Sequence, residues 1–177
     1  MSLWAAVKRL FGFWFFLALA SCGGPTGETP GGSPAPDRES SIYRSLANPL
    51  TVVDAEAARD MISQYRRNSG LPPLEIDEKL QEIAKKQAEE MAHGGSMLRD
   101  SVGALKRRLT AAGVRVAFAT ENVSAGYDTL AEAFSGWRQS APHNARMLEP
   151  RARRMGLATA DAPHSRYKIF WALVLTD

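Results

Sequence analysis

The chain has little thiol chemistry and little excess charge. Its 177 residues contain a single cysteine, Cys22, which excludes an intramolecular disulfide and a zinc site built from several thiolates. The formal net charge is +3, and residues 1–21 hold Lys8 and Arg9 but no acid, so their removal leaves 20 basic against 19 acidic side chains. General nucleic-acid binders owe most of their affinity to an excess of Lys and Arg over the phosphate backbone. We therefore expect no nucleic-acid partner.

The apolar run near the N-terminus is too short for a stable membrane span. It covers Leu10–Ala20, whereas a spanning helix needs about 20 apolar residues. The run follows the basic pair and ends in small residues, which is typical of a signal peptide over residues 1–21. The tripeptide before Cys22, Leu19-Ala20-Ser21, resembles the lipobox of bacterial lipoproteins, in which the cysteine is diacylated and becomes the new N-terminus. The alternative is an ordinary signal peptide followed by a chance cysteine.

Residues 22–50 are poor in side chains that build a core. Nine of the fourteen positions from Gly23 to Pro36 are glycine or proline. A flexible coil of roughly 20 residues would place the following domain about 25 Å from the anchor on average. The sequence predicts a lipid anchor at Cys22, a tether over residues 22–50 and one folded domain over residues 51–177.

Helical periodicity dominates the first half of the domain. It predicts a helix from Asp54 to about Asn68, a second from Asp77 to the Gly94-Gly95 pair, and a third over residues 102–112. We interpret the basic triplet of the third helix, Lys106 to Arg108, as a solvated face.

The second half of the domain mixes strands with helix. Alternation over residues 114–118 predicts a strand, and Asp128 is a candidate cap for a helix that ends at Pro142. Residues 156–160 and 167–175 predict further strands. The last one is apolar on both faces and must be covered on both sides. The resulting expectation is an α+β fold, a three-layer α-β-α sandwich.

Five ordered patterns resemble one family. They are Arg66-x-x-x-Gly70-Leu71-Pro72 with its following helix, Ala111-Ala112-Gly113, Glu121-Asn122-Val123, Trp137-x-x-Ser140-x-x-His143-x-x-x-Met147, and Gly156-Leu157-Ala158. Together they resemble the bacterial CAP domain, of the cysteine-rich secretory protein, antigen 5 and pathogenesis-related superfamily. The resemblance implies an α-β-α sandwich and a cleft that holds two histidines and two glutamates, which bind a divalent metal in some members.

Two of these four cleft residues have a match here. The resemblance assigns Glu121 to one glutamate and His143 to one histidine, places Ser140 where many members have the second glutamate, and places Arg99 where they have the other histidine. A guanidinium has no lone pair for a metal and carries a fixed positive charge. Arg99 is therefore expected to pair with Glu121 instead.

Metal and acid-base chemistry stay open as alternatives. A catalytic zinc site needs three protein ligands, and only Glu121, His143 and, as a weak third candidate, His93 are available. We interpret His164, beside Pro163, as an exposed turn residue. Glu121 and His143 are either an acid-base pair or a structural contact across the cleft. Serine hydrolase chemistry finds no support, because no Gly-x-Ser-x-Gly pattern is present.

The sequence thus favours a membrane-anchored lipoprotein of the bacterial cell envelope, facing the periplasm or the exterior. Its CAP domain would act without a cofactor as a binding module for a lipid, peptide or cell-wall ligand, at a cleft around Glu121 and His143. The alternative is a hydrolase-like enzyme, possibly metal-assisted, that uses the same cleft. Fold membership alone does not decide between them.

Overall fold

The computed structural model describes residues 41–48, 51–95 and 102–177. These residues fall within one compact unit, Pro34–Asp177. The signal peptide, Cys22, most of the tether and Arg99 lie outside the described residues, so the predictions made for them stay predictions. The tether prediction does not hold for residues 41–48, because Leu46 is buried in the core and its N–H donates to the carbonyl of Asp128 at 2.8 Å.

The first two helices begin and end where the sequence predicts. Helix α2 covers Ala55–Asn68, and the side chain of its N-cap residue Asp54 accepts the backbone N–H of Ala57. Helix α3 covers Glu78–Gly94, and its N-cap Asp77 accepts two backbone N–H groups. Gly95 ends α3 in the left-handed conformation, which a glycine adopts without steric cost.

The four strands form a mixed sheet in the order β1-β3-β4-β2. Strand β1 (Glu75–Ile76) runs parallel to β3 (Arg154–Ala162), whereas β4 (Lys168–Thr176) is antiparallel to both β3 and β2 (Ala119–Ala125). The interior strand β4 is buried from Ile169 to Thr176. Its position explains why its sequence is apolar on both faces.

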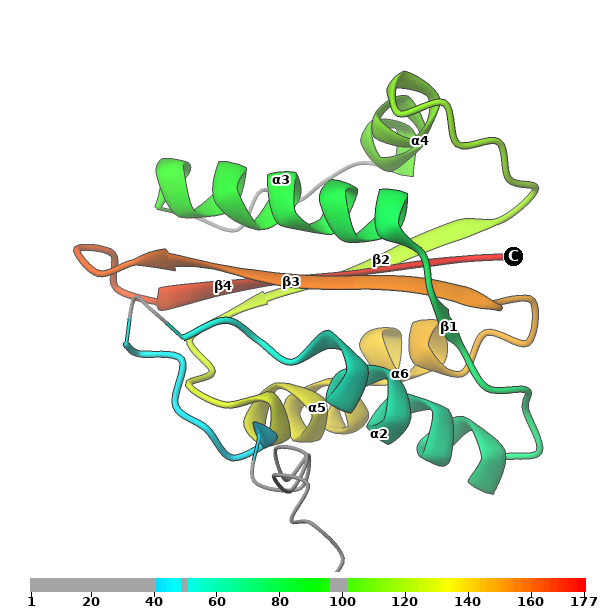
Figure 1. The fold of residues 1–177 in the computed structure, drawn as a ribbon, viewed down its shortest axis with the longest axis horizontal. Helices are drawn as coiled ribbons and strands as arrows, with labels where there is room; N and C mark the ends of the chain where they lie inside the picture. The colour runs from blue at the N-terminus through cyan, green and yellow to red at the C-terminus, as the bar shows by residue number, and fades with distance from the viewer. Residues whose placement is uncertain (1–40, 49–50, 96–101) are drawn as a thin grey trace, which may run out of the picture. The chain divides into compact units, whose positions relative to one another are not determined.

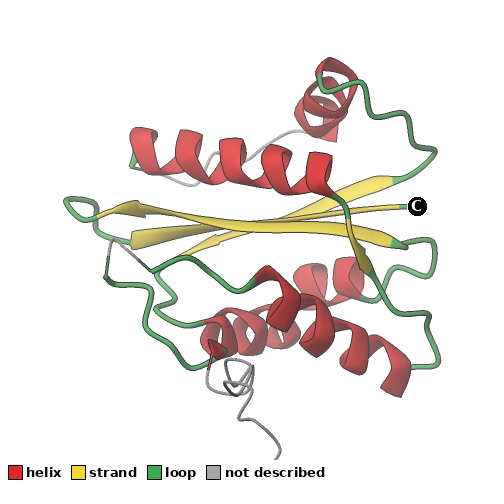
Figure 2. Cartoon of the chain, in the orientation of Figure 1, coloured by secondary structure: helices red, strands yellow, loops and turns green. Residues whose placement is uncertain are grey.

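Helices cover both faces of the sheet, as Figures 1 and 2 show. Helices α3 and α4 (Val102–Ala111) lie on one face, and α2, α5 (Leu130–Gln139) and α6 (Ala141–Met147) lie on the other. Alternate residues of β4 contribute side chains to two separate cores. Trp171 belongs to the core under α2, α5 and α6, whereas Phe170 belongs to the core under α3 and α4. The predicted α+β fold, a three-layer α-β-α sandwich, is confirmed.

The strand predicted over residues 114–118 is wrong. These residues form an irregular connection, and β2 begins only at Ala119. The alternation of buried and exposed side chains is present, but the backbone N–H groups of Ala117 and Phe118 donate to the carboxylate of Asp177 and not to a neighbouring strand. A side chain thus takes the hydrogen bonds that a strand ladder would need.

Two helix boundaries also differ from the prediction. The N-cap of α5 is Thr129, which forms a capping box with Glu132, and not Asp128. Pro142 lies in the first turn of α6 and does not end α5, which stops at Gln139. Proline fits the first turn because its missing N–H would have no partner within the helix there.

Candidate functional site

Glu121 forms an ion pair with Arg108. The Arg108 Nη2 atom lies 2.7 Å from the Glu121 Oε1 atom, and the two side chains are only 17% and 10% exposed. Strand β2 presents Glu121 on the same face as Val123, toward α3 and α4. The interpretation of Arg108 as part of a solvated face is therefore wrong. Arg108 lies on the side of α4 that faces β2, whereas Lys106 and Arg107 stay exposed.

Asn122, the next residue of β2, faces the opposite layer. Its side chain is fully buried and donates a 3.0 Å hydrogen bond to the backbone carbonyl of His143 in α6. Successive strand residues point to opposite faces, so Glu121 and Asn122 connect the edge strand to different helices. The Glu-Asn pair thereby ties both α4 and α6 to β2.

His143 is half-buried at the start of α6. Burial, and secondarily the nearby positive charge of Arg146, lower the pKa of its imidazole below the usual value. The ring is therefore neutral at pH 7. Within the described part of the chain, this imidazole makes no hydrogen bond or ion pair, with Glu121 or any other side chain. The predicted cleft shared by Glu121 and His143 would have to extend around the edge strand β2.

The remaining candidate residues lie apart from this pair or outside the described residues. Ser140 caps α6 through its backbone position alone, with no capping bond from its side chain. His93 is exposed at the end of α3, where its Nδ1 atom lies 3.1 Å from the carbonyl of Glu89. His164 is exposed in the turn between β3 and β4. Arg99 is not among the described residues.

The divalent metal of some family members does not fit the residues described. No group of three or more His, Cys, Asp or Glu side chains within residues 41–48, 51–95 and 102–177 is arranged to hold a metal ion. The carboxylate of Glu121 already faces a guanidinium, whose positive charge opposes a second cation.

Arg66 is a buried cation whose role the sequence did not indicate. Its side chain is fully buried in α2 and donates hydrogen bonds to four backbone carbonyls, those of Pro72, Met147, Glu149 and Ala152. Burial, followed by the charge of Arg153, lowers the pKa of Arg66. The one available signal was its place at the head of the Arg66-x-x-x-Gly70 pattern. Arg66 fixes the segment that follows α6 and thereby the helix that carries His143.

No helix among the described residues is long and apolar enough to cross a membrane.

Solved bacterial structures share this fold. A cysteine-rich secretory protein from Staphylococcus aureus is 21% identical (TM-score 0.58; 68% of this chain and 37% of that one). An extracellular protein with an SCP domain from Bacillus anthracis is 22% identical (TM-score 0.59; 68% and 39%). An outer surface protein from Borrelia burgdorferi is 16% identical (TM-score 0.62; 72% and 97%). The chain thus matches less than half of the length of the first two proteins, and nearly all of the third. No curated protein matches the sequence.

The family follows from the sequence. The model of the cysteine-rich secretory protein family, CAP, matches residues 59–175. This range begins within α2 and ends within β4, and it contains Arg66, Arg108, Glu121 and His143. The chain therefore belongs to the cysteine-rich secretory protein (CAP) family.

Proposed function

We propose that this protein is a lipid-anchored surface protein of a bacterial envelope whose CAP domain binds a ligand and does not catalyse a reaction. The binding region would lie at the edge of β2, between Glu121 on one side and His143 on the other. The anchor would be the acylated Cys22, and several acyl chains at about 0.8 kcal/mol per buried methylene would hold the chain firmly on a membrane. The extracellular and outer surface relatives from Bacillus and Borrelia support a location outside the cytoplasm.

The ion pair between Arg108 and Glu121 carries the proposal. A general base needs a carboxylate that is free to accept a proton from the substrate, and a metal site needs its lone pairs. At 2.7 Å the guanidinium of Arg108 stabilises the ionised, proton-free carboxylate by a charge-assisted hydrogen bond. Such a pair suits recognition of a polar ligand group better than proton transfer.

Zinc titration of the full chain tests the absence of a metal site. We expect weak or no zinc binding in calorimetry at neutral pH, because two ligands beside a fixed cation do not provide the three or four donors of a tight site. Arg99→His should tighten binding measurably, and adding His143→Ala should abolish the gain. Arg107→His, which adds a histidine elsewhere on α4, is the matched control. Micromolar or tighter binding by the unmodified chain would contradict the proposal.

The hydrolase alternative makes a separate prediction. A neutral His143 would then act as the general base, so hydrolysis of a p-nitrophenyl ester should disappear in His143→Gln and persist in His164→Gln. We expect instead that neither variant changes the background rate. Loss of a measurable rate in His143→Gln alone would favour the enzyme.

Membrane fractionation tests the anchor. We expect Cys22→Ser to release soluble protein or to leave the precursor uncleaved, because serine has no thiol to acylate. Ser21→Ala keeps a small residue before the cysteine and should behave like the unmodified protein. If Cys22→Ser still fractionates with membranes as a processed, mature-length chain, the lipoprotein assignment is wrong.

A further inference from the structure

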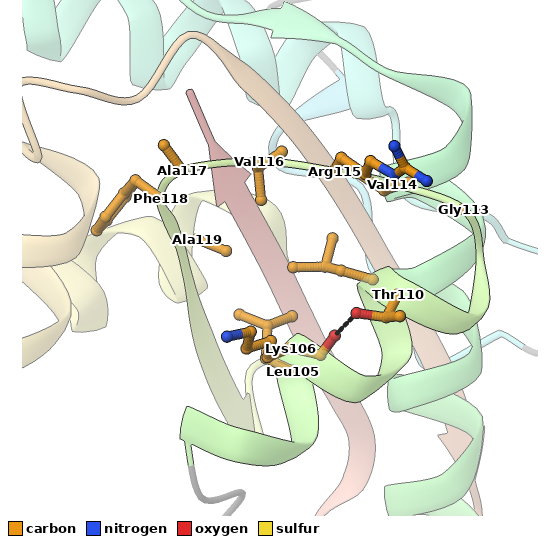
Figure 3. Close-up of a pocket in the computed structure, with 11 residues that line it drawn as sticks. Leu105, Lys106, Thr110, Gly113, Val114, Arg115, Val116, Ala117, Phe118 and Ala119 are labelled. Carbon is orange, nitrogen blue, oxygen red and sulfur yellow. Dashed lines mark hydrogen bonds between the residues drawn. The ribbon is translucent and has the colours of Figure 1, made fainter.

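A pocket lies between α4 and the irregular connection that precedes β2. Its volume is about 690 Å³, and its apolar walls come from Leu105 and Leu109 on α4 and from Val114, Val116 and Phe118 on the connection. Figure 3 shows Leu105 on the helix side and Val116 on the connection side of this space. Glu121, Arg108 and His143 do not line it. The pocket is therefore distinct from the region of the proposed function.

Two exposed cations border the pocket. Lys106 and Arg115 are both exposed lining residues, and neither makes an ion pair within the described residues. The guanidinium of Arg151 stacks 4.0 Å from the ring centre of Phe118, but its charge is paired with Glu149 at 2.7 Å. An occupant with an apolar part and flanking negative charge fits this lining.

The backbone of the connection offers unused hydrogen-bonding groups. Val114 donates its N–H to the carbonyl of Leu109 at 2.9 Å, so this edge of the segment faces the end of α4. Val116 lines the pocket, and within the described residues its backbone N–H and C=O groups have no hydrogen-bond partner.

The connection is held rigid at its far end. The Asp177 carboxylate accepts the N–H groups of Ala117 and Phe118 at 3.2 and 3.0 Å. An edge that is already held in place costs less conformational entropy when a partner peptide pairs with it. Addition of an extended peptide to such an edge supplies main-chain hydrogen bonds, while side-chain pockets provide specificity.

We propose that this pocket binds an extended peptide segment of a partner protein, with one apolar side chain between Leu105 and Val116 and acidic residues beside it. The peptide residue opposite Val116 exchanges both main-chain hydrogen bonds with it. The acidic side chains face Lys106 and Arg115. The acyl chain of a free fatty acid would contact the apolar walls, and its carboxylate would face the cations. A fatty acid has no N–H group, however, to donate to the Val116 carbonyl.

Binding of a capped probe peptide to the full chain in detergent micelles tests this proposal. The probe is Ac-Asp-Val-Leu-Val-Asp-NH2, and its matched control carries Lys in place of both Asp residues. We expect saturable binding of the acidic peptide and at least about tenfold weaker binding of the basic one, by fluorescence anisotropy. The double variant Lys106→Glu/Arg115→Glu should reverse this preference. Lys85→Glu/Lys86→Glu, an equal charge change on exposed positions of α3, should leave it unchanged.

Amide hydrogen exchange measured by NMR distinguishes the occupants. The acidic peptide should slow exchange of the Val116 amide, whereas dodecanoate should shift the Leu105 and Leu109 signals without protecting that amide. The proposal fails if the acidic peptide shows no saturable binding up to about millimolar concentration, or if it binds without protecting Val116. Neither result would bear on the Cys22 anchor or on zinc binding, so this failure is distinguishable from failure of the proposed function.

Discussion

Replacing Arg66 by methionine should destabilise the domain severely. The guanidinium donates hydrogen bonds of 2.9, 2.7, 3.0 and 3.0 Å to the carbonyls of Pro72, Met147, Glu149 and Ala152. Methionine fills a similar apolar volume but has no donor. The four carbonyls would then lose their partner together, at a place from which the native packing excludes water.

The magnitude follows from the number and type of these bonds. A hydrogen bond from a charged donor contributes about 1.5 to 3 kcal/mol, so simple addition of four would approach the whole stability of an average domain. Bonds that share one side chain are not additive, and the loss of one side of a buried ionic network costs about 3 to 5 kcal/mol. We expect Arg66→Met to lower the free energy of unfolding by about 3 to 5 kcal/mol.

Urea denaturation followed by tryptophan fluorescence measures this loss. Arg67→Met is the matched control, because Arg67 is the exposed neighbour and its side chain bonds only to Gln64. It should change the free energy of unfolding by no more than about 0.5 kcal/mol. If Arg66→Met costs less than about 1 kcal/mol, the four carbonyls find other partners, and Arg66 does not hold the segment after α6.

Three further predictions concern packing and pH. Gly156→Ala should cost about 3 kcal/mol or more in urea denaturation, because its Cβ atom would lie 2.1 Å from the backbone carbon of Leu80 in α3. Trp171→Ala should cost about 3 to 5 kcal/mol in the same assay through the cavity that it leaves in the core. The lowered pKa of His143 favours its neutral form in the folded state, so the stability that it contributes above about pH 6.5 should be lost as the pH falls toward the folded pKa. Urea midpoints measured from about pH 7.5 to 5 should fall less in His143→Gln than in the unmodified protein.

Local sequence rules located most elements because those elements depend on local chemistry. Asp54 and Asp77 cap helices wherever an apolar stripe follows them, and Gly95 ends α3 through its own backbone freedom. The apolar run of β4 required cover on both faces, and the sandwich provides it. The same rules wrongly predicted a strand over residues 114–118. The alternation of side chains there is a local feature, whereas the hydrogen bonds to Asp177 that replace strand pairing join residues about 60 positions apart.

The site was only partly visible in the sequence. The family pattern identified Glu121 and His143, since both are carried by short motifs. It did not identify Arg108 as the partner of Glu121, because one member of a basic triplet cannot be told from its neighbours until the angle of α4 to β2 is known. The lowered pKa of His143 likewise depends mainly on the burial of this residue of α6, which only packing decides, and secondarily on Arg146 in the same helix.

The sequence by itself determined the first three helices of the domain, the doubly covered strand, the low net charge and the family, because periodicity, capping residues and motifs are properties of neighbouring positions. Only the tertiary structure decided which cation meets Glu121, which carbonyls converge on Arg66 and that a pocket opens between α4 and the segment before β2. Each of these depends on residues that are distant in the chain and that meet through the packing of two helix layers on one sheet. Periodicity specifies which face of an element is buried, and packing alone specifies what that face contacts.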